Sequence, residues 1–133
     1  DKIITWHGQL PRAKAIQLFN NAHIQVITSI SEGNPTTIWE AMSYGVPTLS
    51  LDHCGMHDTI DDESGIRIPI HSYEQCVKDI ARAIENLLEH PARFKHLSEG
   101  VVRRAEQYTW NKRELVILDF YRKTIDSFNK HSK

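Results

Sequence analysis

Hydrophobic residues in the first half of the chain come in short runs that alternate with helical patterns. Residues 3–6 and 24–28 are short, apolar and rich in β-branched side chains, which is typical of strands. Apolar residues at intervals of three and four lie between such runs, as on one face of a helix. The predicted elements are, in order, a strand at 3–6, a helix at 11–22, a strand at 24–28, a loop at 31–35, a helix at 37–44, a strand at 47–51, a loop at 52–64 and a strand at 65–70.

The second half of the chain, residues 72–128, is predicted to be helical. Ser72 followed by Gln75 is typical of a capped helix start. Pro91 suits the first turn of a second helix, where its missing N–H costs nothing. A third helix is predicted from residue 109. Its apolar residues repeat at helical spacing and are predicted to face the core: Leu115, Leu118, Tyr121, Ile125 and Phe128.

Strands that alternate with helices indicate parallel pairing with the helices on the faces of the sheet. We therefore predict an α/β fold, with a Rossmann-like parallel sheet of about four strands and flanking helices, as a single unit over residues 1–133. Ligands of such sheets bind at the carboxyl ends of the strands. The loops after residues 8, 28 and 51 are therefore the candidates for a binding site.

Composition narrows the classes of function. The chain of 133 residues carries 16 Lys and Arg against 17 Asp and Glu, so it has no excess positive charge for nucleic acid. No apolar run approaches the roughly 18 residues that span a bilayer. Cys54 and Cys76 are too few for a disulfide scaffold, and His53, Cys54 and His57 offer too few ligands for zinc. A cytoplasmic protein without a metal or a nucleic-acid partner is expected.

The loop and helix after the second predicted strand carry the chemistry. Gly33 lets a ligand approach the backbone closely, and Thr36 and Thr37 lie at a helix start, where free N–H groups favour an anion such as phosphate. Glu32 and Glu40 flank this anion site, and a carboxylate suits the vicinal hydroxyls of a sugar or ribose. The alternative is structural, because Thr37 and Glu40 also have the spacing of a capping box.

This segment resembles the E-x7-E motif of the retaining GT-B glycosyltransferases of the family-4 type. The resemblance covers nearly the whole chain, from about residue 3 to residue 125. The matching positions are Glu32, Gly33, Pro35, Glu40, Ala41, Met42, Gly45, Val46, Pro47, the loop at 52–60, Gly65, Ile66, Tyr108, Thr109, Trp110 and Tyr121.

The resemblance implies a role for each residue of the motif. Glu32 is expected to be the catalytic residue beside the hydroxyls of the transferred sugar, and Glu40 to hold the ribose of the nucleotide. The donor sugar and its diphosphate are expected to contact Gly33, Asn34, Pro35, Thr36 and Thr37. No cofactor and no bound metal is expected in this family, because helix ends and basic side chains stabilise the leaving diphosphate.

Several positions depart from the pattern of the family. Asn34 replaces an aromatic or aliphatic residue, which is expected to alter the sugar pocket. Trp39 replaces an aliphatic residue and is predicted to pack in the core. Residues 53–56 replace smaller residues in a loop that borders the donor. His7, at the end of the first predicted strand, and His53 are candidates for the rim of the pocket.

The resemblance also implies a larger enzyme, of which residues 1–133 would be the C-terminal part of the donor-binding domain. The partners would be a nucleotide sugar and a glycan or lipid-linked acceptor, the latter bound mainly by an N-terminal domain. An arginine and a lysine that face the diphosphate in the family have no replacement in Lys2 or Arg12, so the chain alone is expected to be inactive. Self-association through an uncovered sheet edge and peripheral contact with the inner face of a membrane are further candidate interactions.

Two other functions remain open at this stage. A sugar-nucleotide epimerase of GT-B architecture would share the fold, although the Glu32 to Pro35 context favours the transferases. A binding module related to receiver or flavodoxin domains would also be α/β. A receiver would need an acidic cluster at a strand end and a lysine on a later strand. The sequence offers only Asp61 and Asp62 in a loop. The nucleobase, the sugar and the acceptor cannot be read from the sequence.

Overall fold

Parallel strands form the centre of the molecule. The computed structural model describes residues 3–131, and in them β1 (Gln25–Ile27), β2 (Thr48–Leu51) and β3 (Gly65–Ile68) form one sheet in the order β1-β2-β3. Gln25 pairs with Thr48, and Thr48 pairs with Gly65 on its other side. The α/β architecture predicted from the sequence is therefore confirmed.

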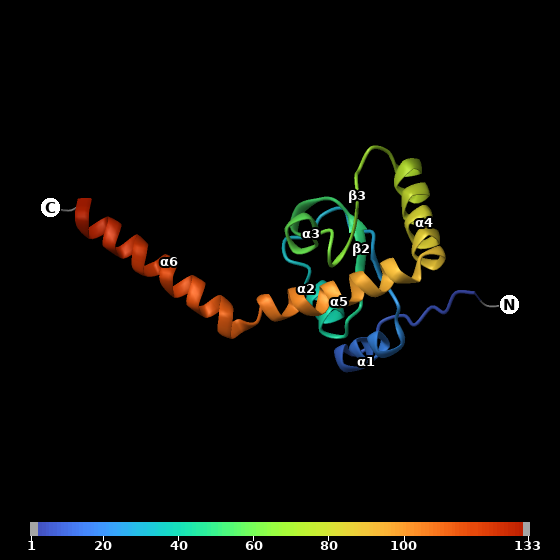
Figure 1. Ribbon diagram of the computed structural model, residues 1–133, viewed down its shortest axis with the longest axis horizontal. Helices are drawn as coiled ribbons and strands as arrows, with labels where there is room; N and C mark the ends of the chain where they lie inside the picture. Colours follow the sequence, from blue (N-terminus) through green and yellow to red (C-terminus); the bar gives the residue numbers. More distant parts are fainter. Residues whose placement is uncertain (1–2, 132–133) are drawn as a thin grey trace.

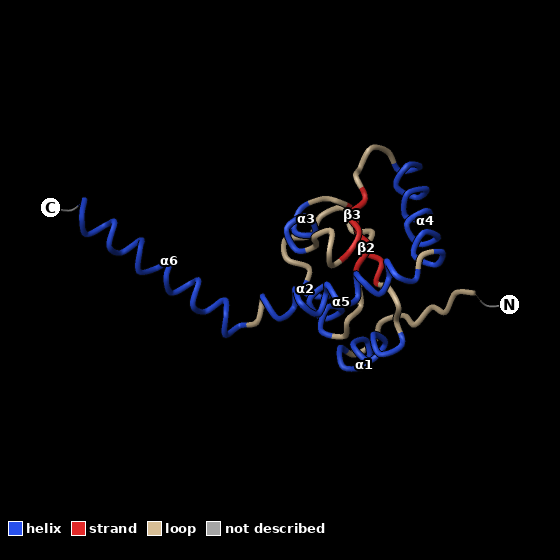
Figure 2. The backbone as a smooth tube through the Cα atoms, viewed as in Figure 1, coloured by secondary structure: helices blue, strands red, loops and turns tan. Residues whose placement is uncertain are grey.

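Helices cover both faces of this sheet (Figures 1 and 2). On one face, Leu49, Leu51 and Ile68 pack against α4. On the other face, a core of Ile38, Met42, Met56, Ile60 and Val101 joins α2, α3 and α5. The helices are α1 (Arg12–Gln17), the 3-10 helix η1 (Leu18–Asn21), α2 (Thr36–Ser43), α3 (Cys54–Thr59), α4 (Tyr73–Glu89), α5 (Pro91–Gln107) and α6 (Trp110–His131).

All four residues of β2 are buried, because this central strand is covered on both faces. Its side chains alternate between leucines and the polar Thr48 and Ser50. The Thr48 hydroxyl donates a hydrogen bond to Gln25 Oε1 at 2.8 Å, and the Ser50 hydroxyl donates to the carbonyl oxygen of Leu51 at 3.2 Å. The polar side chains of the strand are therefore satisfied inside the core.

The prediction of a strand at 3–6 is wrong for this structure, and the sheet has three strands where about four were predicted. Residues 3–6 are exposed coil, and Trp6 is 91% exposed. β-Branched residues favour a strand only where a neighbouring strand supplies hydrogen bonds and a packing face. No strand pairs with the outer edge of β1 among the residues that the structure describes.

The helices predicted in both halves of the chain are observed. The Ser72 hydroxyl accepts a hydrogen bond from the Gln75 N–H at 3.1 Å, so the predicted cap is confirmed, and Pro91 is the first residue of α5. Gly45 ends the helix that precedes it with φ at +69°, a conformation that favours glycine. The loop predicted at 52–64 instead contains the short helix α3.

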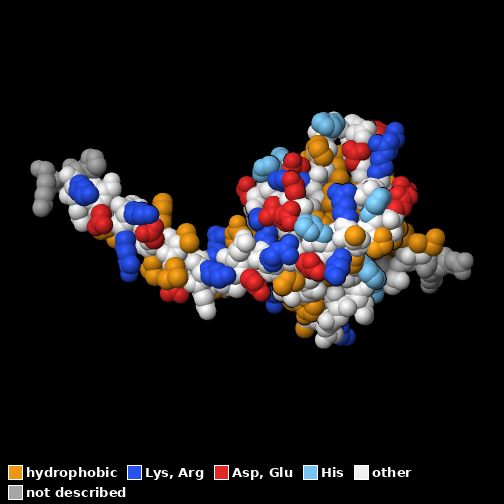
Figure 3. All heavy atoms as spheres, in the orientation of Figure 1, with side chains coloured by type: hydrophobic (Ala, Val, Ile, Leu, Met, Phe, Trp, Pro, Cys, Tyr) orange, Lys and Arg blue, Asp and Glu red, His pale blue; other side chains and the backbone are white. Residues whose placement is uncertain are grey.

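The apolar face of α6 does not reach the core, which corrects the prediction for this helix. The helix extends away from the body of the protein (Figure 1), and Leu115 is 68% exposed. Figure 3 shows hydrophobic side chains along this arm next to lysines, arginines and acidic residues. Periodicity shows that a helix is amphipathic but does not show what covers its apolar face. Within residues 3–131, no helix is both long enough and apolar enough to cross a membrane.

The Arg104 side chain connects α5 to the end of α3. Its guanidinium donates hydrogen bonds to the carbonyl oxygens of Thr59 at 2.6 Å and Asp58 at 3.0 Å, and it forms an ion pair with Asp61. Only 12% of the Arg104 side chain is exposed. These contacts connect elements 43 to 46 positions apart in the sequence.

Replacing Arg104 by leucine is expected to lower the free energy of unfolding by about 2 kcal/mol, because two carbonyl groups and a carboxylate lose their partner. Urea denaturation measures this change. Arg103→Leu is the matched control, since the Arg103 side chain is 54% exposed and its ion pair with Glu63 is 3.8 Å long. The control is expected to change stability by less than about 0.5 kcal/mol, and equal losses in the two variants would contradict the role of Arg104.

Candidate functional site

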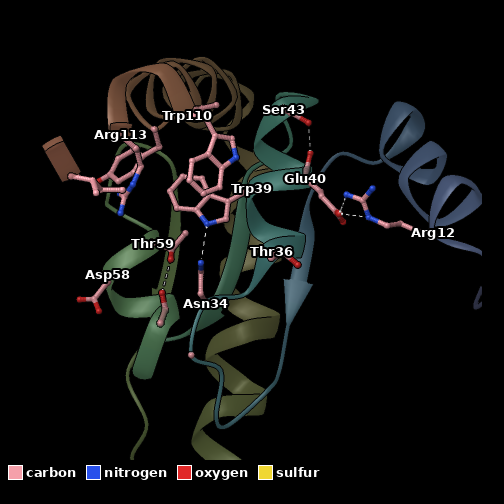
Figure 4. Close-up of a pocket in the computed structure, with 15 residues that line it drawn as sticks. Arg12, Asn34, Thr36, Trp39, Glu40, Ser43, Asp58, Thr59, Trp110 and Arg113 are labelled. Carbon is pink, nitrogen blue, oxygen red and sulfur yellow. Dashed lines mark hydrogen bonds and ion pairs between the residues drawn. The ribbon is translucent and has the colours of Figure 1, made fainter. Parts of the chain in front are cut away.

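A cleft with a volume of about 850 Å³ opens at the end of β1, beside the loop that leads into α2. Six segments meet around it, and Figure 4 shows Trp39, Trp110 and Arg113 on one side of α2 and the paired Glu40 and Arg12 on the other. The walls consist of Arg12 from α1, Gly33 and Asn34 from the loop, Thr36, Trp39, Glu40 and Ser43 from α2, Gly55, Asp58 and Thr59 from α3, and Ala105, Tyr108, Trp110, Arg113 and Ile117 from the region of α5 and α6. The cleft therefore lies at the carboxyl side of the sheet, as expected for this class of fold.

The loop after β1 is held in place by α3. The Gly55 N–H donates a hydrogen bond to the carbonyl oxygen of Glu32 at 2.8 Å. A Cβ on Gly55 would lie 2.2 Å from the carbonyl oxygen of Gly33, so the two segments touch backbone to backbone. Cys54, which precedes this contact, has φ at +48°. The close approach fixes Gly33 in the wall of the cleft.

The start of α2 is open toward ligands. Its cap residue is the buried Pro35, and no side chain caps the first turn. The first N–H groups of a helix have no acceptor within the helix, and they carry the positive end of the helix dipole. Thr36 is exposed and lines the cleft, so the first turn of α2 forms part of the cleft wall.

Glu40 is paired with an arginine from a distant part of the sequence. Glu40 Oε1 accepts a hydrogen bond from Arg12 Nε at 3.0 Å and a second bond from Arg12 Nη2. The side chain of Glu40 is 20% exposed. The capping-box alternative is wrong, because α2 begins at Thr36 and its cap residue is Pro35 rather than Thr37. Glu40 therefore belongs to the cleft and does not serve the backbone of the helix start.

Trp39 packs against the core, as predicted, but it is only half-buried and also lines the cleft. Its Nε1–H donates a hydrogen bond to Asn34 Oδ1 at 3.1 Å, and Figure 4 shows the two side chains facing each other. The centroid of its ring lies 4.9 Å from that of Tyr108. Trp39 contacts the core residues around Ile38 as well.

The structure brings four of the predicted site residues together in this cleft: Gly33, Asn34, Thr36 and Glu40. The other predicted site residues are not among those that line it. Glu32 is half-buried in the loop next to Gly33, and Pro35 is buried. Thr37 is exposed, and its carbonyl oxygen accepts a hydrogen bond from Gln25 Nε2 at 3.3 Å. His7, in the coil before α1, and His53, the cap residue of α3, are both exposed and are not among the residues that line the cleft.

The side of the cleft formed by α5 and α6 was not predicted from the sequence. Arg113 lines the cleft with its guanidinium 5.3 Å from the ring centroid of Tyr108, and within residues 3–131 it has no carboxylate partner. Arg12 also lines the cleft, although it was not expected to face a diphosphate, and Lys2 lies outside the described residues. A signal for this wall was present, because Tyr108 and Trp110 belong to the matched motif. Their proximity to residues 33–40 depends on the path of α5 across α2.

No metal centre is built in the part of the chain that the structure covers. Among residues 3–131, no group of three His, Cys, Asp or Glu side chains lies close enough together to hold an ion. His57 Nδ1 lies 2.6 Å from Asp52 Oδ1, whereas His53 and Cys54 are exposed.

Three comparisons place this geometry among known proteins. The chain is 26% identical to the D-inositol 3-phosphate glycosyltransferase of Saccharomonospora viridis over 114 residues, which are 85% of this chain and 26% of the relative. The solved GtfA/B complex superposes with a TM-score of 0.79 at 21% identity, over 95% of this chain and 25% of that chain. The pneumococcal O-GlcNAc transferase GtfA, solved with UDP and GlcNAc, gives 0.65 at 26% identity, over 84% and 22%.

These structures share the GT-B glycosyltransferase fold. The chain spans about a quarter of the length of the curated relatives it matches. The model of the family Glycosyl transferases group 1 matches residues 2–99, which include the whole sheet and the segment from Glu32 to Glu40. The chain therefore belongs to the family Glycosyl transferases group 1.

Proposed function

We propose that the cleft binds a nucleoside-diphosphate sugar and that the chain supplies the donor-binding portion of a retaining glycosyltransferase. The reaction would transfer a hexose to a glycan or to a lipid-linked acceptor. The observation that carries this proposal is the meeting of Glu40, Gly33 and the uncapped start of α2 in one cleft. These groups offer a carboxylate, a close backbone approach and free N–H groups to one ligand.

Each group suits one part of such a donor. The N–H groups at the start of α2 would face the diphosphate, where negative charge builds up as the nucleotide leaves, and they are oriented before the reaction begins. Both bonds from Arg12 go to Glu40 Oε1, and Oε2 has no partner among the described residues. Oε2 would accept hydrogen bonds from the ribose hydroxyls. Glu32 would lie at the sugar end, beside Gly33.

The comparisons support a nucleotide-sugar donor. The relative from Saccharomonospora viridis is named as a glycosyltransferase, and the pneumococcal transferase was solved with UDP and a sugar. We propose a nucleotide of the same general kind for this chain. The basic groups available to its diphosphate in the cleft are Arg12 and Arg113.

A titration of the isotope-labelled chain followed by NMR tests this proposal. Millimolar UDP or GDP is expected to shift the backbone amides of residues 33–40. Glu40→Gln is expected to weaken binding by about tenfold, the usual effect of losing a charge-assisted hydrogen bond.

Glu85→Gln provides the control, because it makes the same charge change on α4, behind the opposite face of the sheet. This variant is expected to bind as the wild type does. If neither nucleotide shifts these amides in the wild-type chain, the donor-binding function is wrong and a module with another ligand is favoured.

A further inference from the structure

The hydrogen bond between Trp39 and Asn34 determines which end of the Asn34 amide is available to a ligand. An indole Nε1–H can only donate, so the group it meets at 3.1 Å must be the oxygen of the amide. The –NH2 group is then the free end. Asn34 is exposed and lines the cleft, and the –NH2 group has no hydrogen-bond partner among the described residues.

Trp39 is held firmly enough to impose this orientation. Trp39 packs against the Ile38 core, and its ring centroid lies 4.9 Å from that of Tyr108, with the two ring planes at 38°. Tyr108 is itself held by the guanidinium groups of Arg104 at 5.0 Å and Arg113 at 5.3 Å from its ring centroid. Because the Trp39 ring contacts both the core and Tyr108, its N–H has less freedom to move than the exposed Asn34 side chain, so Asn34 turns its amide oxygen to Trp39.

We propose that Asn34 determines donor binding through its side chain, with Trp39 as the residue that positions it. The –NH2 group of Asn34 donates a hydrogen bond to an oxygen of the sugar diphosphate, either on a phosphate or on a hydroxyl of the sugar. This inference rests on the proposed function, since it assigns the Asn34 amide to the donor in the same cleft. It also links two positions at which the chain departs from the family pattern.

The test uses UDP and UDP-glucose as probes, or GDP and GDP-mannose if GDP is the nucleotide that binds. Asn34→Asp keeps an oxygen for the Trp39 N–H but replaces the donor by a negative charge. It is expected to weaken binding by about tenfold or more, because a hydrogen bond is lost and a like charge faces the phosphates. Asn34→Ala is expected to cost about fivefold. An effect on both probes identifies a phosphate oxygen, and an effect on the sugar nucleotide alone identifies a hydroxyl.

Trp39→Phe keeps a ring and removes the N–H, so it isolates the positioning role. It is expected to weaken binding by about threefold, and the double variant Asn34→Ala with Trp39→Phe is expected to bind no worse than Asn34→Ala alone. A merely structural bond predicts the opposite order, because Asn34→Asp preserves an acceptor for the indole. The indole Nε1–H resonance is expected to stay hydrogen-bonded in Asn34→Asp and to change in Asn34→Ala.

Asn129→Asp, near the end of α6, makes the same charge change away from the cleft and is expected to leave binding unchanged. Binding by Asn34→Asp within about twofold of the wild type for both probes would overturn the inference. In that case the loss of the N–H donor and the gain of a negative charge at residue 34 would have had no effect. Failure of the wild-type chain to bind either nucleotide would instead reject the proposed function itself. The two failures are therefore distinguished by the wild-type titration.

Discussion

Replacing Gly100 by alanine is expected to destabilise the fold by about 3 kcal/mol or more, or to prevent folding. A Cβ at this position of α5 would lie 1.7 Å from the carbonyl oxygen of Glu63 and 2.7 Å from its carbonyl carbon. Both atoms belong to the backbone, so no side-chain rotation relieves the contact. The turn that contains Glu63 is also held in place, because Ser64 is fully buried and its hydroxyl donates a hydrogen bond to Asp61 Oδ1.

Chemical denaturation of the wild type and the variant measures this loss. Alanine is a better helix former than glycine by about 1 kcal/mol, so helix propensity alone predicts the opposite sign. Glu99→Ala is the control, because the neighbouring Glu99 is exposed and forms only a 3.8 Å ion pair with Lys95. It is expected to change stability by less than about 0.5 kcal/mol. A Gly100→Ala variant as stable as the wild type would show that α5 does not touch residues 63–64.

The elements that could be predicted from the sequence are those whose signal is local. β2, β3 and the starts of α4 and α5 follow from short apolar runs, a serine cap and a proline, all within a few residues. Residues 3–6 and α6 carry equally clear local patterns, and there the predicted pairing and packing are not observed. A strand needs a hydrogen-bonding neighbour and an apolar helix face needs a covering surface, and neither is encoded in the segment itself.

In the candidate site, too, the residues that could be predicted are those with a local pattern, and the rest depend on the tertiary fold. The segment from Glu32 to Glu40 is continuous, so its glycine, helix start and carboxylates could be found by spacing. The partner of Glu40 is Arg12, 28 positions earlier, and the opposite wall includes Arg113, which no local pattern connects to the loop. Trp39 packs against the core, as predicted, but the residue type alone did not indicate that its polar edge would find an acceptor in Asn34 at the surface.

Gly55→Ala is expected to damage both stability and ligand binding, because Gly55 is where α3 meets the loop of the site. A Cβ would lie 2.2 Å from the carbonyl oxygen of Gly33 and 2.9 Å from that of Glu32. The loop must therefore move away from α3, which breaks the hydrogen bond from the Gly55 N–H to Glu32. We expect a loss of about 3 kcal/mol in the free energy of unfolding, and nucleotide binding at least about tenfold weaker, since Gly33 leaves its place in the cleft wall.

Gly33→Ala is the matched control for stability. Gly33 is the other residue in this backbone contact, but a Cβ added to it would meet no atom within 4 Å. It is expected to leave stability within about 0.5 kcal/mol of the wild type. Measuring unfolding and nucleotide titration on the same samples separates the two consequences of Gly55→Ala. If the variant unfolds more easily but its folded form binds UDP or GDP as tightly as the wild type, the loop is only a structural contact of α3. Joint loss of stability and binding is expected instead, because the backbone contact that holds the loop also places Gly33 where the diphosphate would lie.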